Sequence, residues 1–145
     1  MIEFYDATVR VRYAETDQMG VVYHANYLVW LEVGRVELLR ALGVEYQRME
    51  MEDDCHIVVA DAKCRYHASA KYDEVLRIRT RIVESWTRMI KFSYEVIRDA
   101  DSKLLATGKT THVICGSNGR PKSLPEKYRR VFAKFATADP KRRSE

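Results

Sequence analysis

Strict alternation of hydrophobic and polar residues marks several short runs of the chain. The first run is residues 8–13, and four more lie at 57–67, 75–84, 89–98 and 103–115. A period of two is typical of a strand that buries one face. Short polar connections of hairpin length join the last three runs. The pattern therefore predicts a largely antiparallel sheet with one apolar and one polar face.

A different pattern covers residues 25–42. This segment lacks proline, is rich in Leu, Glu, Arg and Ala, and ends at Gly43, which is a typical helix stop. Apolar residues recur along one side and also occupy the other, which predicts a helix that is buried nearly all round. The first side carries Tyr27, Leu31, Gly34, Leu38 and Leu42, and the other carries Val29, Trp30, Val33 and Val36. A weakly amphipathic helix is expected at 126–136.

The order of elements is one strand, one long helix and then four strands, with no internal repeat and no linker. One apolar sheet face must then cover one apolar helix. We therefore expect an α+β fold in which an antiparallel sheet wraps around one long central helix, formed by residues 1–136. Within the run 57–67, the alternation places Val58 and Ala60 on the apolar face. Residues 137–145 are expected to form a basic C-terminal tail.

The composition narrows the possible classes of function. With 145 residues, 46% of them hydrophobic and 32% charged, the chain has the size and balance of one globular domain. No stretch reaches the roughly 18 apolar residues of a membrane span, and the first residues lack the parts of a signal peptide. We therefore expect a cytoplasmic protein without integral membrane association. The three cysteines lack a paired spacing, and no pattern predicts a metal or another cofactor.

The net charge of +4 is concentrated near the C-terminus. Residues 127–145 contain seven basic and two acidic side chains, a local charge of +5, so the preceding residues sum to −1. A basic tail can attract nucleic acid. Because the rest of the chain is almost neutral and has no face of interleaved aromatic and basic residues, we expect no nucleic-acid partner. The segment is interpreted as a solvated terminal helix with a frayed end.

The segment between the first strand and the long helix holds the candidate chemistry. Asp17 stands a few residues before the predicted helix, where free backbone N–H groups at 24–26 and the positive end of the helix dipole can polarise a carbonyl oxygen. Asp17 can act there as a general base toward water or attack the carbonyl carbon itself. Gly20 allows the loop to turn back past a ligand. A carboxylate beside a helix N-terminus is a minimal acyl-transfer site.

Each of these residues also has a purely structural interpretation. Taken alone, Asp17 caps the loop or the helix, and His24 packs near the helix start. Tyr13 and Tyr23 are core or rim aromatics in this interpretation. Glu15 is expected to be solvated.

Arg35 lies on the long helix among Leu31, Leu38 and Leu42. A charge at a buried position needs a partner, and we expect a carboxylate. The contact is interpreted as a structural ion pair rather than as a contact with substrate.

The sequence around Asp17 closely resembles the signature of the 4-hydroxybenzoyl-CoA thioesterase family. Within that family the chain is most similar to the short acyl-CoA thioesterases associated with the bacterial Tol–Pal envelope system. The resemblance extends over nearly the whole chain. It rests on Asp17-x-x-Gly20-Val-Val-Tyr-His24-x-Asn26-Tyr27, on Arg35-Val-Glu37, on the strand 57–66, and on a turn Gly119-Arg-Pro followed by Leu124-Pro125.

This resemblance implies a hotdog fold, in which the sheet surrounds the long helix. It also implies the hydrolysis of an acyl-CoA thioester to the free acid and coenzyme A, without a metal or another cofactor. Members of the family form dimers with one continuous sheet, often doubled into homotetramers, and their active site lies at the dimer interface. We therefore expect a homo-oligomer, a dimer or a tetramer, that binds acyl-CoA.

The family's functional residues carry over onto positions of this sequence. By resemblance, Asp17 is the catalytic carboxylate, His24 and Tyr13 support it, and a backbone N–H near His24 polarises the carbonyl. The implied substrate-binding residues are Tyr23, then Val59, Ala60 and Asp61 along the channel for the acyl-pantetheine arm, and Arg88 and Lys91 at the nucleotide phosphates.

A non-catalytic function is the alternative. A hotdog protein can keep the fold and engage acyl carrier protein or envelope-biogenesis partners without turnover. The aspartate of the motif is present at position 17, which favours the hydrolase.

Overall fold

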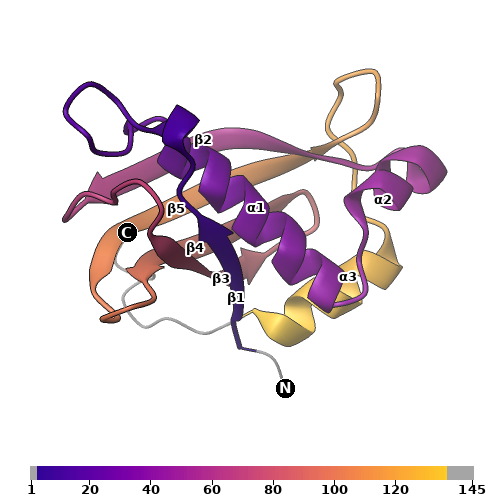
Figure 1. Ribbon diagram of the computed structural model, residues 1–145. Helices are drawn as coiled ribbons and strands as arrows, with labels where there is room; N and C mark the ends of the chain where they lie inside the picture. Colours follow the sequence, from indigo (N-terminus) through magenta and orange to yellow (C-terminus); the bar gives the residue numbers. More distant parts are fainter. Residues whose placement is uncertain (1–2, 137–145) are drawn as a thin grey trace.

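Five antiparallel strands form one sheet, and a long helix lies across one face of it (Figure 1). The computed structural model describes residues 3–136, so the predicted tail 137–145 lies outside the described residues. The strands are β1 (Tyr5–Arg10), β2 (His56–Tyr66), β3 (Val75–Ser85), β4 (Met89–Arg98) and β5 (Leu104–Cys115). The helices are α1 (Asn26–Ala41), α2 (Tyr46–Asp53) and α3 (Glu126–Phe135), with a 3-10 turn, η1, at Tyr13–Glu15. The predicted α+β fold is confirmed, and α2 is an addition to the predicted elements.

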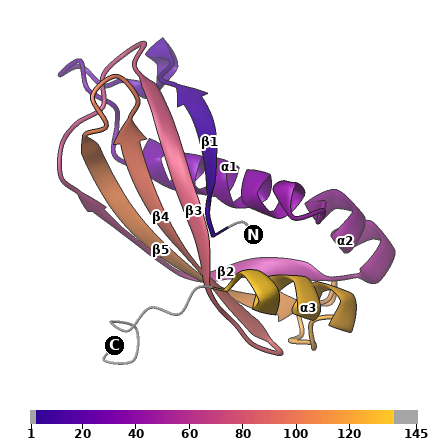
Figure 2. The same ribbon diagram turned by 90° about the horizontal axis from the view of Figure 1, so that it is seen from below.

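The strand order in the sheet is β1-β3-β4-β5-β2, and every neighbouring pair is antiparallel. β1 and β2 are therefore the two edges. Figure 2 shows α1 and α3 on the same side of the sheet. Among the described residues no helix covers the opposite face, where β3 and β4 present their partly exposed, mostly polar positions. The sheet thus has the predicted buried and solvated faces.

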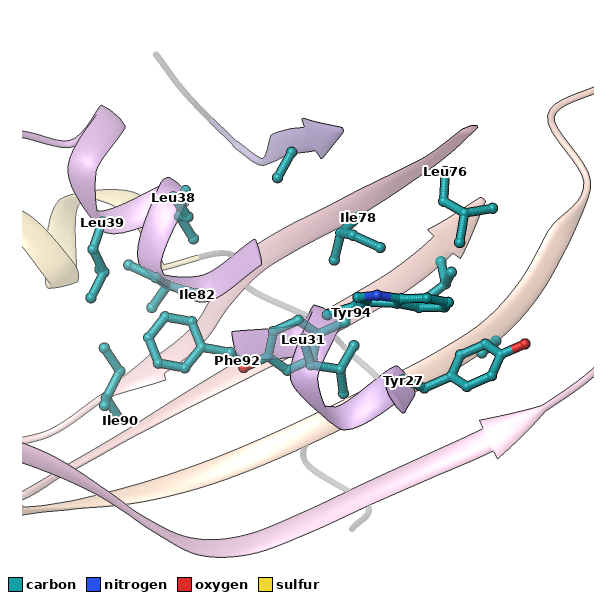
Figure 3. Close-up of a cluster of buried hydrophobic side chains, with 14 of the residues drawn as sticks. Tyr27, Leu31, Leu38, Leu39, Leu76, Ile78, Ile82, Ile90, Phe92 and Tyr94 are labelled. Atoms are coloured by element: carbon teal, nitrogen blue, oxygen red, sulfur yellow. The ribbon is translucent and has the colours of Figure 1, made fainter. Parts of the chain in front are cut away.

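The core lies between α1 and the inner face of the sheet. Its largest buried side chains include Leu31, Leu38, Ile78, Ile82, Phe92 and Tyr94 (Figure 3). Two glycines allow a close approach. A Cβ at Gly34 would lie 2.5 Å from Thr80 Oγ1 on β3, and a Cβ at Gly108 would lie 2.8 Å from Leu31 Cδ1. Because neither glycine leaves room for a side chain, the position of α1 on the sheet is tightly constrained.

A buried polar network crosses this core. Arg35 Nη1 donates to the Tyr94 hydroxyl at 3.1 Å, and this hydroxyl lies 2.5 Å from Thr110 Oγ1. His112 Nε2 lies 2.8 Å from the same threonine oxygen. Within residues 3–136 no carboxylate pairs with Arg35. The expected ion pair is therefore wrong, because hydroxyl groups of the sheet face the guanidinium where α1 crosses β4 and β5.

A β-bulge in β2 changes which of its residues face the core. The register of β2 against β5 shifts between Val59 and Asp61, which leaves Ala60 without a partner residue on β5. Val59 pairs with the buried His112, whereas Val58 pairs with Val113. Residues paired across antiparallel strands share a face, so Val59 and not Val58 belongs to the inner face. The alternation therefore predicted the wrong face for Val58, because one extra residue shifts the period. From Ala62 onward, which pairs with the buried Thr110, the predicted face is correct.

The long helix is less buried than its apolar composition predicts. Leu28 and Val29 are 44% and 49% exposed, although the predicted stripe from Tyr27 to Leu38 is buried. Val58 and Val59 on the edge strand β2 are also about half exposed. A single chain therefore leaves apolar side chains uncovered on both the helix and one edge of the sheet.

The buried histidine predicts how stability depends on pH. Burial, and then the positive charge of Arg35, lower the pKa of His112 to about 3, well below the ordinary histidine value of about 6.5. Between these values the unfolded chain binds a proton that the folded chain does not. Stability is therefore complete above pH of about 6.5 and falls on acidification toward pH 3, by at most about 1.4 kcal/mol per pH unit from this residue.

Denaturant unfolding of the wild-type protein and of His112→Gln, at several pH values from 4 to 7, measures this contribution. The variant is expected to show a flatter dependence over this range, because its side chain does not titrate. The imidazole proton signals of His112 should also stay constant down to pH 4.5. Parallel pH dependences, or titration of this imidazole near pH 6, would contradict the assignment.

Candidate active site

The candidate residues lie at the two opposite ends of the sheet and on the edge strand between them. We call the end formed by 11–24 and 66–74 the loop end, since Val11 N donates to Glu74 O and the Tyr66 hydroxyl donates to His24 O there. We call the end formed by 85–89 and 114–124 the turn end, since Ile114 N donates to Arg88 O there. β3 runs between them for eleven residues, which at about 3.3 Å per residue separates the two ends by roughly 33 Å.

Asp17 lies in a tight hairpin at the loop end. Thr16 and Val22 form an antiparallel bridge, Asp17 N donates to Val21 O, and Gly20 adopts a φ of +79°, as the expected turn requires. One Asp17 carboxylate oxygen accepts the Met19 N–H at 2.8 Å. The side chain is exposed, and Figure 1 shows the hairpin projecting from the start of α1. Its carboxylate therefore has free acceptor capacity toward a ligand.

Glu15 fixes the base of this hairpin, and its predicted solvation is wrong. Only 4% of the residue is exposed. One carboxylate oxygen accepts Arg12 N at 2.7 Å and the other accepts Trp30 Nε1 at 2.9 Å. Its carbonyl oxygen accepts both Tyr23 N and Asn26 Nδ2. Glu15 thus ties the end of β1, the hairpin and the first turns of α1 together.

The start of α1 offers backbone donors beside the hairpin. Asn26 N donates to Tyr23 O, so one of the three expected free N–H groups is used. Within residues 3–136, no acceptor is bonded to the N–H of His24 or Ala25, and no side chain caps the helix. These two donors, together with the positive end of the helix dipole, are therefore available to an acceptor such as water or a carbonyl oxygen.

Aromatic side chains surround this helix start. The Tyr23 ring lies 4.5 Å from the His24 ring, and both are exposed. Tyr13 is also exposed and makes an edge contact with Tyr72. Neither contact joins Tyr13 or His24 to the Asp17 carboxylate. Beside His24 lies an open cavity of about 250 Å³, lined by Val22, His24, Tyr27, Tyr66, His67, Ala68 and Ser69.

Arg88 and Lys91 lie at the turn end, so a single chain does not bring them to Asp17. Arg88 is exposed in the turn between β3 and β4, and Lys91 follows on β4. Val59, Ala60 and Asp61 lie between the two ends, at the middle of β2, and all three are exposed. The predicted site residues therefore fall into three groups: the first lies at the loop end, the second at the middle of the edge strand β2, and the third at the turn end.

The described residues contain no group of three side chains that could hold a metal ion. Asp53 accepts the Tyr128 hydroxyl and pairs with Lys127, while Asp54 accepts Ser117 N. These aspartates therefore connect α2 to the loop 115–124 and to α3. Within the same residues, the helices are too short or too polar to cross a membrane.

Sequence reasoning missed Glu15, Tyr66 and His67 as residues of this site. No alternation signals the burial of Glu15, because β1 ends at Arg10 and Tyr13, two residues before Glu15, is 78% exposed. Tyr66 and His67 reach the site only because the end of β2 meets the start of α1. No local pattern in the sequence reports that meeting.

Comparisons with known proteins cover most of the chain. A family model described as the Thioesterase-like superfamily matches residues 11–132. YneP of Bacillus subtilis is 38% identical over 130 residues, which cover 90% of this chain and 91% of YneP. The acyl-CoA thioesterase YbgC of Haemophilus influenzae is 33% identical over 126 residues, with 86% of this chain and 90% of that protein covered.

Solved structures agree with the sequence relatives. A hypothetical protein from Thermus thermophilus matches with a TM-score of 0.82 and 36% identity, covering 92% of this chain and 99% of that chain. The DHNA-CoA thioesterase from Staphylococcus aureus matches with a TM-score of 0.86 and 28% identity, covering 90% and 89%. The expected hotdog fold is confirmed, and the chain belongs to the Thioesterase-like superfamily.

Proposed function

We propose that this protein is an acyl-CoA thioesterase in which Asp17 and the start of α1 carry the reaction. One observation supports this most directly: an exposed carboxylate lies in the hairpin that leads into an uncapped helix, where the N–H groups of His24 and Ala25 have no acceptor among residues 3–136. The similarity to YbgC supports a CoA thioester as the substrate. Hydrolysis needs a base or nucleophile and a carbonyl polariser, and both are present at the loop end.

The chemistry follows from these two groups. The thioester carbonyl oxygen accepts the free N–H groups at the helix start, which stabilise the negative charge of the tetrahedral intermediate. Asp17 takes a proton from water as the water oxygen bonds to the carbonyl carbon, or its own oxygen attacks that carbon first. In the first route the carbon–sulfur bond breaks and Asp17 returns the proton to the sulfur, which releases the free acid and the thiol of coenzyme A. In the second route the sulfur leaves as the thiolate of coenzyme A, and water then hydrolyses the anhydride formed with Asp17, which releases the acid and regenerates the carboxylate. His24 and Tyr13 support the carboxylate from the rim of the site.

The complete site is shared between two copies of the chain. β2 is an edge strand with exposed apolar residues, so it can pair with the β2 of a second copy. Antiparallel pairing about the middle of β2 would place the loop end of one copy beside the turn end of the other. Arg88 and Lys91 of one chain would then meet the nucleotide of a substrate whose thioester reaches Asp17 of its partner. Val59, Ala60 and Asp61 would line the channel between them, in a dimer or in a tetramer built from dimers.

The acyl group would enter at the loop end, where an open cavity of about 250 Å³ lies beside His24 in a single chain. Tyr23 and the aromatic walls would contact the acyl group and the adjoining pantetheine arm. The resemblance to the short acyl-CoA thioesterases of the Tol–Pal system favours a short acyl group. Binding of acyl carrier protein without turnover is the alternative, and a thiol-release assay separates the two.

Replacement of Asp17 by Asn tests the proposed chemistry. The amide keeps the size of the side chain and an oxygen for the Met19 N–H, but it is neither a base nor a nucleophile. With acyl-CoA as substrate, kcat is expected to fall about 100-fold or more, with a much smaller change in KM. The measurement is thiol release from a panel of acyl-CoA esters.

Asp101→Asn is the matched control. Asp101 accepts Lys103 N in the hairpin between β4 and β5, the same contact that Asp17 makes with Met19. This control should keep wild-type kcat. Near-full turnover by a folded Asp17→Asn protein would refute the assignment.

Glu15 is proposed as the positioning residue that holds the Asp17 hairpin against α1. Glu15→Gln replaces one acceptor oxygen by a donor, so either Arg12 N or Trp30 Nε1 loses its partner. This should cost about 1–3 kcal/mol in the free energy of unfolding. It should also lower kcat more than it raises KM, because a displaced carboxylate is poorly oriented.

The double variant Glu15→Gln/Trp30→Phe serves as the control for this mechanism. It removes the indole N–H, so its loss of stability should be smaller than the sum of the two single losses. Unchanged stability and kcat in Glu15→Gln would show that Glu15 does not position the hairpin.

A further inference from the structure

An exposed tryptophan stands at the turn end of the sheet, apart from the residues assigned to the reaction. Trp86 is 43% exposed in the turn between β3 and β4. Lys91 Nζ lies 5.6 Å from the centre of its ring, as a cation over an aromatic face. The other tryptophan, Trp30, is buried and hydrogen-bonded to Glu15. Trp86 is therefore a large, exposed aromatic side chain that does not belong to the hydrophobic core.

Three backbone hydrogen bonds fix the turn that carries Trp86. Trp86 N donates to Met89 O within the hairpin, Ile114 N donates to Arg88 O, and Leu124 N donates to Thr87 O. These bonds connect the turn to β5 and to the loop before α3. The ring therefore lies on an ordered turn, so little conformational entropy of the protein is lost when a ligand stacks on it.

Charge around the ring is mainly positive. Arg88 is exposed two residues after Trp86, and the exposed Arg120 lies in the loop 115–124, which is bonded to the same turn. Lys91 faces Glu84 across the hairpin in the strand register, so one carboxylate lies at the base of this group. The turn end therefore combines a flat aromatic surface with cations within a few residues. A ligand that matches both features is a planar base joined to phosphates.

We propose that Trp86 stacks on the adenine base of the coenzyme A nucleotide, next to the phosphates that the family resemblance already assigns to Arg88 and Lys91. This proposal rests on the proposed function and adds a recognition element for the nucleotide half of the substrate. Because Lys91 lies over one face of the ring, the base would stack on the other face, and the ammonium would remain close enough to meet a phosphate. Nucleotide recognition would then occur at the turn end, far from the thioester.

Two substrates separate nucleotide recognition from the chemistry. Acyl-CoA carries the nucleotide, and the corresponding acyl-pantetheine lacks it. In Trp86→Ala, the ratio of kcat/KM for acyl-CoA to kcat/KM for acyl-pantetheine should fall about tenfold or more, through KM for acyl-CoA. Trp86→Phe keeps an aromatic face and should lose less. An unchanged ratio in Trp86→Ala would overturn the proposal.

Phe4→Ala is the matched control, because Phe4 is also a partly exposed ring under a cation. Its ring centre lies 4.0 Å from Arg79 Cζ, but this arginine is already paired with Asp6. The control should keep the wild-type ratio. An equal fall of the ratio in Phe4→Ala would show that loss of any exposed ring produces the effect, which would also overturn the proposal.

Tryptophan fluorescence provides a test that does not depend on turnover. Adenosine 3′,5′-bisphosphate should quench the wild-type emission saturably, pantetheine should not, and Trp86→Phe should lose the response. Equal quenching by pantetheine, or full retention of the response in Trp86→Phe, would contradict the stacking. If wild type hydrolyses neither thioester, the proposed thioesterase function fails, while saturable quenching would still support the nucleotide site.

Discussion

The rest of this structure depends on one constraint, the close packing of α1 against the sheet. Gly34 and Gly108 leave no space for a side chain between the helix and strands β3 and β5, so the helix has little freedom to slide. The start of α1 is thereby placed against the end of β2, where the Tyr66 hydroxyl meets His24 O. Glu15 then fixes the hairpin to the same helix through Trp30. Core packing thus decides where a carboxylate and two free N–H groups are presented.

The second constraint is the open edge of the sheet. β2 has neighbours on one side and exposed valines at its centre, so a single chain is incomplete in both its hydrogen bonding and its apolar burial. The same strand separates Asp17 from the cations at the turn end. One pairing of β2 with a second copy would cover the edge and bring the two ends together. In the proposed dimer, both assembly and substrate recognition would depend on this exposed strand.

The sequence predicted the last four strands and the long helix to within one or two residues, because alternation and helical spacing are local properties. The first strand, predicted at 8–13, instead lies at Tyr5–Arg10, because the chain leaves the sheet for the 3-10 turn at Tyr13–Glu15. The prediction failed where a tertiary contact decides the outcome. The bulge at Ala60 shifts the faces of β2, which no alternation can show. Glu15 is buried because Trp30 and Arg12 N satisfy it, and Arg35 takes a tyrosine hydroxyl instead of a carboxylate. The motif alone indicates Asp17 as a candidate site residue, whereas the hydrogen bonds of Glu15 are evident only from the folded structure.

The shared site is tested most directly by combining two defective chains in one oligomer. Asp17→Asn and Arg88→Ala/Lys91→Ala chains with different tags are co-expressed, and mixed dimers are purified through both tags. If each site takes Asp17 from one chain and the cations from the other, a mixed dimer contains one intact site and one doubly altered site. At limiting acyl-CoA it should recover about half of the wild-type activity, far above either parent. Activity equal to the average of the two parents would show that each chain carries a complete site, and would contradict the account.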